Sequence, residues 1–113
     1  MKILTTYYAD LKNLSPDIVP ISIAGKKPEG VGILEYKRLA PSWSIFSEYK
    51  YGEGTQENYV RRFKAEILGK LSREQVLQDL EEMSGGKDVA LCCYEKPGDF
   101  CHRHIVKDWL DGK

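Results

Sequence analysis

The stretch that decides the fold of this chain is Val89-Ala90-Leu91-Cys92-Cys93-Tyr94. A turn and an amphipathic segment follow it in residues 95–110. An unbroken apolar run of this length predicts a strand that is covered on both faces, as in a parallel sheet. The turn contains Pro97 and Gly98, and Asp99 can cap a helix that runs through Leu110. The expected buried stripe of that helix is Ile105, Val106, Trp109 and Leu110.

The N-terminal third predicts further strands. Residues 2–8 alternate and are rich in Thr and Tyr, which is typical of a strand. Residues 18–24 predict a second strand, in which Pro20 indicates a sheet edge or a strand start. Residues 25–32 contain Gly and Pro and predict a loop, and residues 33–39 fit either a strand or a short helix.

Two helices are expected between these strands and the apolar run. Thr55 can cap a helix over about residues 56–68, whose apolar side chains recur at the helical period. Ser72 and Gln75 have capping-box spacing at the start of a second helix, which Gly85-Gly86 closes. The order of elements predicts an α/β fold, a single layered domain with a small, mostly parallel sheet flanked by helices.

Composition limits the classes of protein that the chain can belong to. With 42% hydrophobic and 30% charged residues, residues 1–113 are expected to form one soluble domain. Seventeen basic and seventeen acidic side chains cancel, which argues against a dedicated polyanion binder. No apolar run approaches the roughly 18 residues of a membrane span, and residues 1–8 are too polar for a signal peptide. We therefore expect a cytoplasmic protein without a membrane partner, whose three cysteines are reduced thiols.

All three cysteines and both histidines lie within residues 91–110. In open α/β sheets, ligands bind outside the carboxyl ends of strands and against helix N-termini, where free N–H groups favour an anion. The same position lowers the pKa of a thiol, so Cys101 is a candidate catalytic thiolate. The alternative is that Cys101 is a small buried residue that packs the first helical turn.

The neighbours of Cys101 suggest roles in the same chemistry. Arg103 can hold a phosphate or carboxylate bidentately, which makes it a candidate substrate-binding residue. His102 is a candidate proton carrier, or alternatively a structural residue bonded to a backbone carbonyl. Glu95 follows the strand and is a candidate acid, base or hydroxyl acceptor, whereas His104 is expected on the surface.

A metal site could be drawn from Cys93, Cys101, His102 and His104, but it is not expected. Zinc sites usually use ligand pairs such as Cys-x-x-Cys with a second pair well separated, and no such spacing occurs here. Cys92 and Cys93 point to opposite faces of a strand and are expected to be core residues. The sequence therefore predicts neither a metal ion nor another cofactor.

Cys93 to His104 resembles the signature of the family catalogued as domain of unknown function 488, which is a strand ending in Cys-x-Glu, a turn with Pro and Asp, and Cys-His-Arg opening a helix. Residues 36–42 and 21–23 are similar to its weaker middle and early motifs. The resemblance implies a small bacterial or phage-type cytoplasmic α/β protein and supplies no established reaction. Many relatives place an Arg after the early strand, where this chain has Lys26 as a stand-in. Ser22 and Lys26 are therefore further candidate substrate-binding residues.

The aromatic residues in the middle of the chain allow two interpretations. Trp43, Phe46, Tyr49 and Tyr51 interleave with Lys50, a pattern that fits base stacking as well as a packed strand and loop. Acidic neighbours dilute the nearby basic pairs, so contact with nucleic acid is not favoured.

The sequence favours an enzyme that acts on a small anionic or nucleotide-type ligand at the start of the last helix. The alternative, from another class, is a non-catalytic module that binds nucleic acid or protein and uses Cys-His-Arg as a structural motif.

Overall fold

The apolar run at residues 89–94 forms the central part of a four-stranded sheet in the computed structural model, which describes residues 1–113. All strand pairs are parallel, and the strand order is β1-β4-β2-β3. The α/β class and the small parallel sheet are thus confirmed. The strands are β1 (Ile3–Tyr7), β2 (Ile18–Ser22), β3 (Leu34–Glu35) and β4 (Asp88–Cys93).

Strand β4 lies between β1 and β2, and Leu91 is in register with Thr5 and Ile21. The strand ends at Cys93, one residue earlier than the apolar run, and Tyr94 is 52% exposed. Pro20 fits its position because β3 pairs with β2 only from Ile21 onward. The amide hydrogen that Pro20 lacks is therefore not needed by β3.

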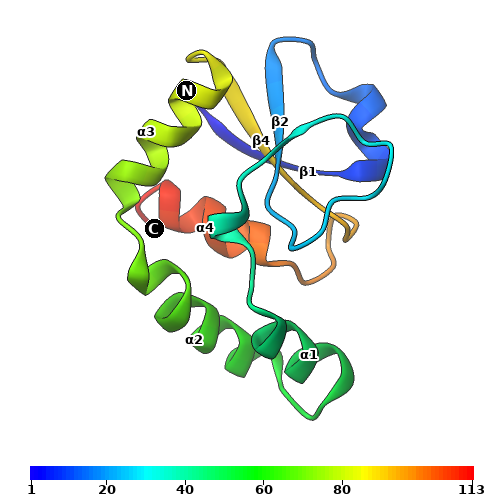
Figure 1. Ribbon diagram of the computed structural model, residues 1–113, viewed down its shortest axis with the longest axis vertical. Helices are drawn as coiled ribbons and strands as arrows, with labels where there is room; N and C mark the ends of the chain where they lie inside the picture. The colour runs from blue at the N-terminus through cyan, green and yellow to red at the C-terminus, as the bar shows by residue number, and fades with distance from the viewer.

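Four α-helices follow or separate the strands (Figure 1). The predicted serine and threonine caps are present, since Thr55 Oγ1 accepts from the amide of Asn58 and Ser72 Oγ from that of Gln75. Gly85 ends its helix in the left-handed conformation, at φ 66°. The helices are α1 (Trp43–Tyr51), α2 (Gln56–Glu66), α3 (Arg73–Ser84) and α4 (His102–Leu110).

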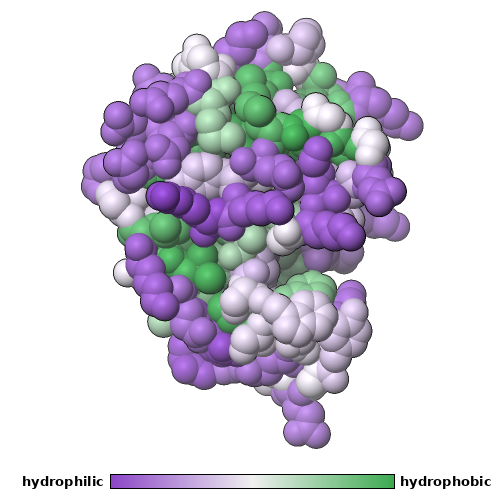
Figure 2. Space-filling model, in the orientation of Figure 1, coloured by the Kyte–Doolittle hydropathy of each residue, from purple (hydrophilic) through white to green (hydrophobic).

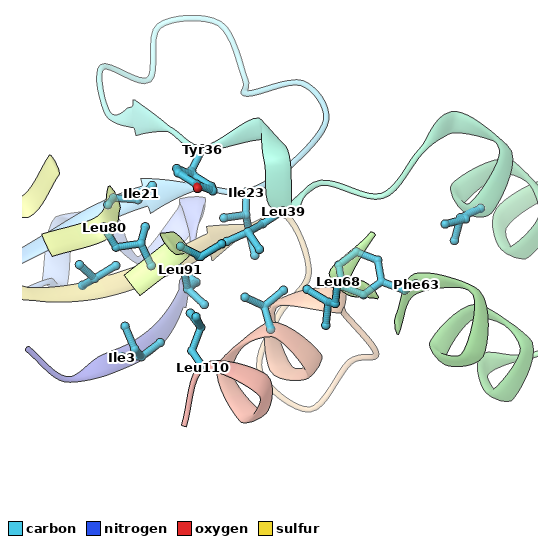
Figure 3. Close-up of a cluster of buried hydrophobic side chains, with 14 of the residues drawn as sticks. Ile3, Ile21, Ile23, Tyr36, Leu39, Phe63, Leu68, Leu80, Leu91 and Leu110 are labelled. Atoms are coloured by element: carbon cyan, nitrogen blue, oxygen red, sulfur yellow. The ribbon is translucent and has the colours of Figure 1, made fainter. Parts of the chain in front are cut away.

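The helices cover one face of the sheet rather than both. Each of the four contributes to the same core cluster, which contains Val89 and Leu91 from β4 (Figure 3). Ala90 and Cys92 point to the opposite face, where Tyr8 of the 3₁₀ helix η1 (Tyr8–Asn13) bonds to the hydroxyl of Ser22 at 2.6 Å. The expectation that helices flank the sheet is confirmed, and β1 and β2 are joined by η1 and a loop instead of an α-helix.

Helix α1 is not expected from the sequence, in which the aromatic residues between 43 and 51 fit base stacking as well as a packed strand and loop. Only Ile45 of this helix is buried, so the apolar stripe that would reveal a helix is missing. The helix is defined by its cap instead, since Ser42 Oγ accepts from the amide of Ile45 at 3.2 Å. Residues 33–39 form both expected alternatives in succession, the short strand β3 and the 3₁₀ helix η2 (Lys37–Leu39).

The start of α4 differs from the prediction. Asp99 does not cap the helix, because its amide closes a turn to the carbonyl of Lys96 and Cys101 is the N-cap residue. The predicted stripe is confirmed, since Val106 and Leu110 are buried and Ile105 and Trp109 pack partly buried against the core. None of the helices has the length and apolar character that crossing a membrane requires.

Candidate active site

The carboxyl edge of the sheet faces α1 across a cavity of about 890 Å³, within the range of about 300–1,000 Å³ of small-molecule sites. Figure 2 shows a hollow between the body built around the sheet and the lower lobe that contains α1 and α2. Four parts of the chain line it: residues 24–26 after β2, side chains within residues 41–59 from α1 and the start of α2, residues 93–95 at the end of β4, and residues 99–102.

Two neighbouring elements place the candidate catalytic residues in this cavity. Cys93 ends β4 and Glu95 follows it, while Cys101 and His102 begin α4. All four side chains line the cavity, together with the N-terminus of α4. The structure therefore brings together Cys101, His102 and Glu95, the three candidate catalytic residues, and adds Cys93, which was expected in the core.

His102 is held by both of its ring nitrogens. Nε2 lies 2.7 Å from the carbonyl oxygen of Ile23, which can only accept, so Nε2 carries a hydrogen and donates it. Nδ1 faces two sulfurs, at 3.7 Å from Cys101 Sγ and 3.9 Å from Cys93 Sγ. The ring of Phe63 packs edge-on against the imidazole, with centroids 5.5 Å apart. His102 is thus oriented to exchange a proton with a thiol.

The two thiols have opposite tendencies. The pKa of Cys101 lies well below its usual range, chiefly because Cys93 donates a hydrogen bond to its sulfur and because His102 and the amide of Arg103 also favour the thiolate. The pKa of Cys93 is raised by that same hydrogen bond and by burial. Of the pair, Cys101 is therefore the thiol whose surroundings favour the thiolate, and Cys93 is the one whose surroundings favour the protonated form.

Glu95 lies beside this pair in an apolar setting. Its Oε2 atom is buried and has no hydrogen-bond partner. Burial raises the pKa of the Glu95 carboxyl, and the negative charge of Cys101 raises it further. Glu95 consequently retains its proton to higher pH than an ordinary glutamate, as a general acid must.

Donor atoms of a type that suits soft metals also meet here. The sulfurs of Cys93 and Cys101 and a ring nitrogen of His102 all lie within 4.8 Å of one another, and the three residues are buried. These residues were named from the sequence but rejected on spacing, and that rule does not apply when one ligand comes from a strand end and two from a helix start. His104 is exposed, as expected, and does not belong to it.

The candidate substrate-binding residues are placed differently from one another. Lys26 lines the cavity, and its carbonyl accepts a hydrogen bond of 2.5 Å from the Tyr94 hydroxyl. Arg103 is only 1% exposed and does not line the cavity, and its Nε and Nη1 atoms have no partner. Ser22 is buried and bonded to Tyr8 outside the cavity. Of these three, only Lys26 is within reach of a ligand there.

Aromatic rings form part of the cavity wall beside the thiols, and of these the sequence drew attention to Tyr49 but not to Tyr59 or Phe100. Phe100 packs against Tyr49 and Tyr59, with centroid separations of 5.2 and 5.0 Å. Tyr59 is one of the buried residues of α2, and its ring also lines the cavity. Its pKa is raised by burial, so its hydroxyl stays protonated and can donate to a ligand.

Comparison with known proteins gives one match. Residues 6–113 match the model of the family DUF488-N3a, described as the active DUF488-N3 subclade. No curated protein and no solved structure matched the chain.

Proposed function

Because the chain belongs to the DUF488 family and matches a subclade described as active, we propose that it is an enzyme that uses Cys101 as a nucleophile on a small anionic ligand. The observation that carries the proposal is the arrangement of Cys101, His102 and Glu95 around one cavity. A nucleophile within reach of a base that is itself oriented by a third group is the usual geometry of covalent catalysis. Here the orienting group is the carbonyl of Ile23.

In the first half of the proposed reaction, the Cys101 thiolate bonds to an electrophilic carbon of the ligand. The bond from that carbon to the leaving group breaks, and the leaving group takes the proton of Glu95. His102 Nδ1 accepts the proton of any Cys101 that is still a thiol, and the imidazolium so formed stabilises the thiolate beside it. Cys93 supports the thiolate as a hydrogen-bond donor.

In the second half, water or another acceptor attacks the same carbon and displaces Cys101 as a thiolate. The Glu95 carboxylate, having lost its proton in the first half, takes the proton of the attacking group. Lys26 and the N-terminus of α4 supply the positive potential that favours an anionic ligand. The proposal therefore assigns anion binding to Lys26 rather than to the buried Arg103.

The Glu95→Gln variant tests this proposal, because it keeps the shape of the side chain and removes both the acid of the first half and the base of the second. Attack by the Cys101 thiolate is slowed but still possible with a good leaving group, whereas hydrolysis of the adduct has no other assigned base, so over a long incubation the adduct accumulates. Incubation with a protein-free extract of cellular metabolites is expected to leave a covalent adduct on Cys101, detected by intact-mass and peptide mass spectrometry. Cys101→Ser is the control that carries no adduct at this site. Adducts that fall equally on Cys92, or on no cysteine, would argue against nucleophilic catalysis.

A further inference from the structure

We propose that the cavity binds a nucleobase, which stacks on Trp43 and Phe46 of α1 while the attached phosphate lies toward Lys26 and Lys50. The inference rests on the proposed function in using the same cavity, and it names the chemical class of the ligand.

Trp43 is the first observation in support. It lines the cavity from the first turn of α1, yet 70% of its surface is exposed. Phe46 lies one turn further on the same wall, with its ring centroid 5.8 Å from that of Trp43 and the planes inclined by 38°. Two aromatic side chains that line a cavity and leave an indole largely uncovered offer a surface for a planar ring.

The charges on the cavity wall are the second observation. Lys26 and Lys50 both line the cavity, both are exposed, and neither takes part in an ion pair. The acidic lining residues, Glu95 and Asp99, come from the β4–α4 turn, so the α1 wall itself carries a lysine and no carboxylate. Unpaired ammonium groups beside exposed aromatic rings suit a ligand that joins a base to a phosphate.

The shape of the site favours a nucleobase over a flat protein surface. Trp43 and Phe46 belong to the wall of a cavity that also contains the Cys101 thiolate, so a ligand stacked on them occupies the same space as the reacting group. The volume of about 890 Å³ is sufficient for a whole nucleotide.

The two tryptophans of the chain allow a direct test. In the Trp109→Phe variant, Trp43 is the only indole, and its fluorescence is expected to be quenched by one or more of AMP, GMP, CMP and UMP. Calorimetry is expected to show binding at least about five-fold weaker in Trp43→Ala, given the usual contribution of base stacking. Leu34→Ala is the control, because Leu34 is a large apolar side chain on β3 that is 46% exposed and does not line the cavity. Its effect is expected to stay below about two-fold.

The nucleobase can belong to a free nucleotide or to a nucleic acid, and a single-stranded hexanucleotide distinguishes these sources. Quenching by the mononucleotides assigns a free nucleotide, and quenching by the hexanucleotide alone assigns a nucleic acid. The inference is overturned if neither quenches Trp43, if Trp43→Ala binds as tightly as the wild type, or if ribose 5-phosphate binds as tightly as the nucleotides.

Nucleotide titrations and the adduct experiment, taken together, separate this inference from the proposed function. Nucleotide binding without a Cys101 adduct in Glu95→Gln would remove the catalytic role and leave the binding site. An adduct in Glu95→Gln without nucleotide binding would keep the enzyme and remove the nucleobase.

Discussion

Nδ1 of His102 lies 3.7 Å from the sulfur of Cys101 because Nε2 of the same ring is tied to the carbonyl of Ile23, 2.7 Å away. This bond uses the hydrogen of the neutral ring and leaves the Nδ1 lone pair facing the thiols. The residue that follows strand β2 thus fixes the orientation of the base at the start of α4. The thiol and its base therefore depend on the packing of the sheet edge, not only on the local sequence.

The Gln variant of His102 tests the role of this nitrogen. Gln can still donate to the carbonyl of Ile23 but has no basic nitrogen in place of Nδ1 that could take the proton of the thiol, so alkylation of Cys101 at pH 7 is expected to slow at least about ten-fold. The rate is measured with iodoacetamide, and thermal unfolding shows whether the variant folds. A folded His102→Gln protein with the wild-type rate would show that His102 is only structural.

Cys93 and Cys92 form a matched pair for a second prediction, since they are adjacent, buried and on opposite faces of β4. Cys93→Ala removes the thiol that donates to Cys101, so the pKa of Cys101 should rise and its alkylation at pH 6 should slow. Cys92→Ala should leave that rate unchanged. Equal effects of the two substitutions would indicate a general loosening of the core.

The raised pKa of Glu95 predicts that its contribution to the stability of the folded protein decreases as the pH rises. Its pKa is raised in the folded protein by burial and by the charge of Cys101, so the folded state holds this proton more tightly than the unfolded state. The contribution to stability is complete below the ordinary glutamate pKa and is lost as pH rises through the raised value. Relative to the wild type, Glu95→Gln should therefore gain thermal stability between pH 4 and pH 7. A difference in melting temperature that is constant over this range would contradict the prediction.

Anion binding can be assigned to one of two cations. Phosphate at ten times its dissociation constant should raise the free energy of unfolding of the wild type by about 1.4 kcal/mol. Lys26→Gln should reduce the effect, because Lys26 lines the cavity and only Lys50 then remains there as a lysine, whereas Arg103→Met should retain it in full because Arg103 is buried away from the cavity. Melting curves with and without phosphate measure both. The reverse pattern would restore Arg103 as the anion ligand.

The elements with strong local signals were predictable from the sequence. The apolar run of β4, the caps at Thr55 and Ser72, and the closing Gly85 each depend on a few neighbouring residues, and all are confirmed. Helix α1 was not predictable from its periodicity because it buries only Ile45. The placement of all helices on one sheet face depends on long-range packing, which a local hydrophobic pattern does not predict.

Only the part of the site that is contiguous in sequence was predictable. The motif around Cys101 and His102 drew attention to the start of α4, but its partners come from distant segments: the carbonyl of Ile23, the aromatic ring of Tyr59 and the ammonium group of Lys26. Arg103 was expected to face a ligand from its place in the first helical turn, yet the helix packs closely enough on the sheet to bury it. Burial of this kind is decided by how α4 docks, not by its sequence.

The central claim, that Cys101 is a reactive thiolate reached through the cavity, is tested most directly by brief alkylation of the native protein with iodoacetamide over a range of pH. Peptide mass spectrometry ranks the three thiols, with the denatured protein as the reference in which they react alike. We expect Cys101 to be labelled well before Cys92 and Cys93, and its rate to persist as the pH falls below the ordinary thiol pKa of about 8.5. Labelling of Cys101 no faster than that of Cys92, with a rate that falls away below pH 8.5, would contradict the account.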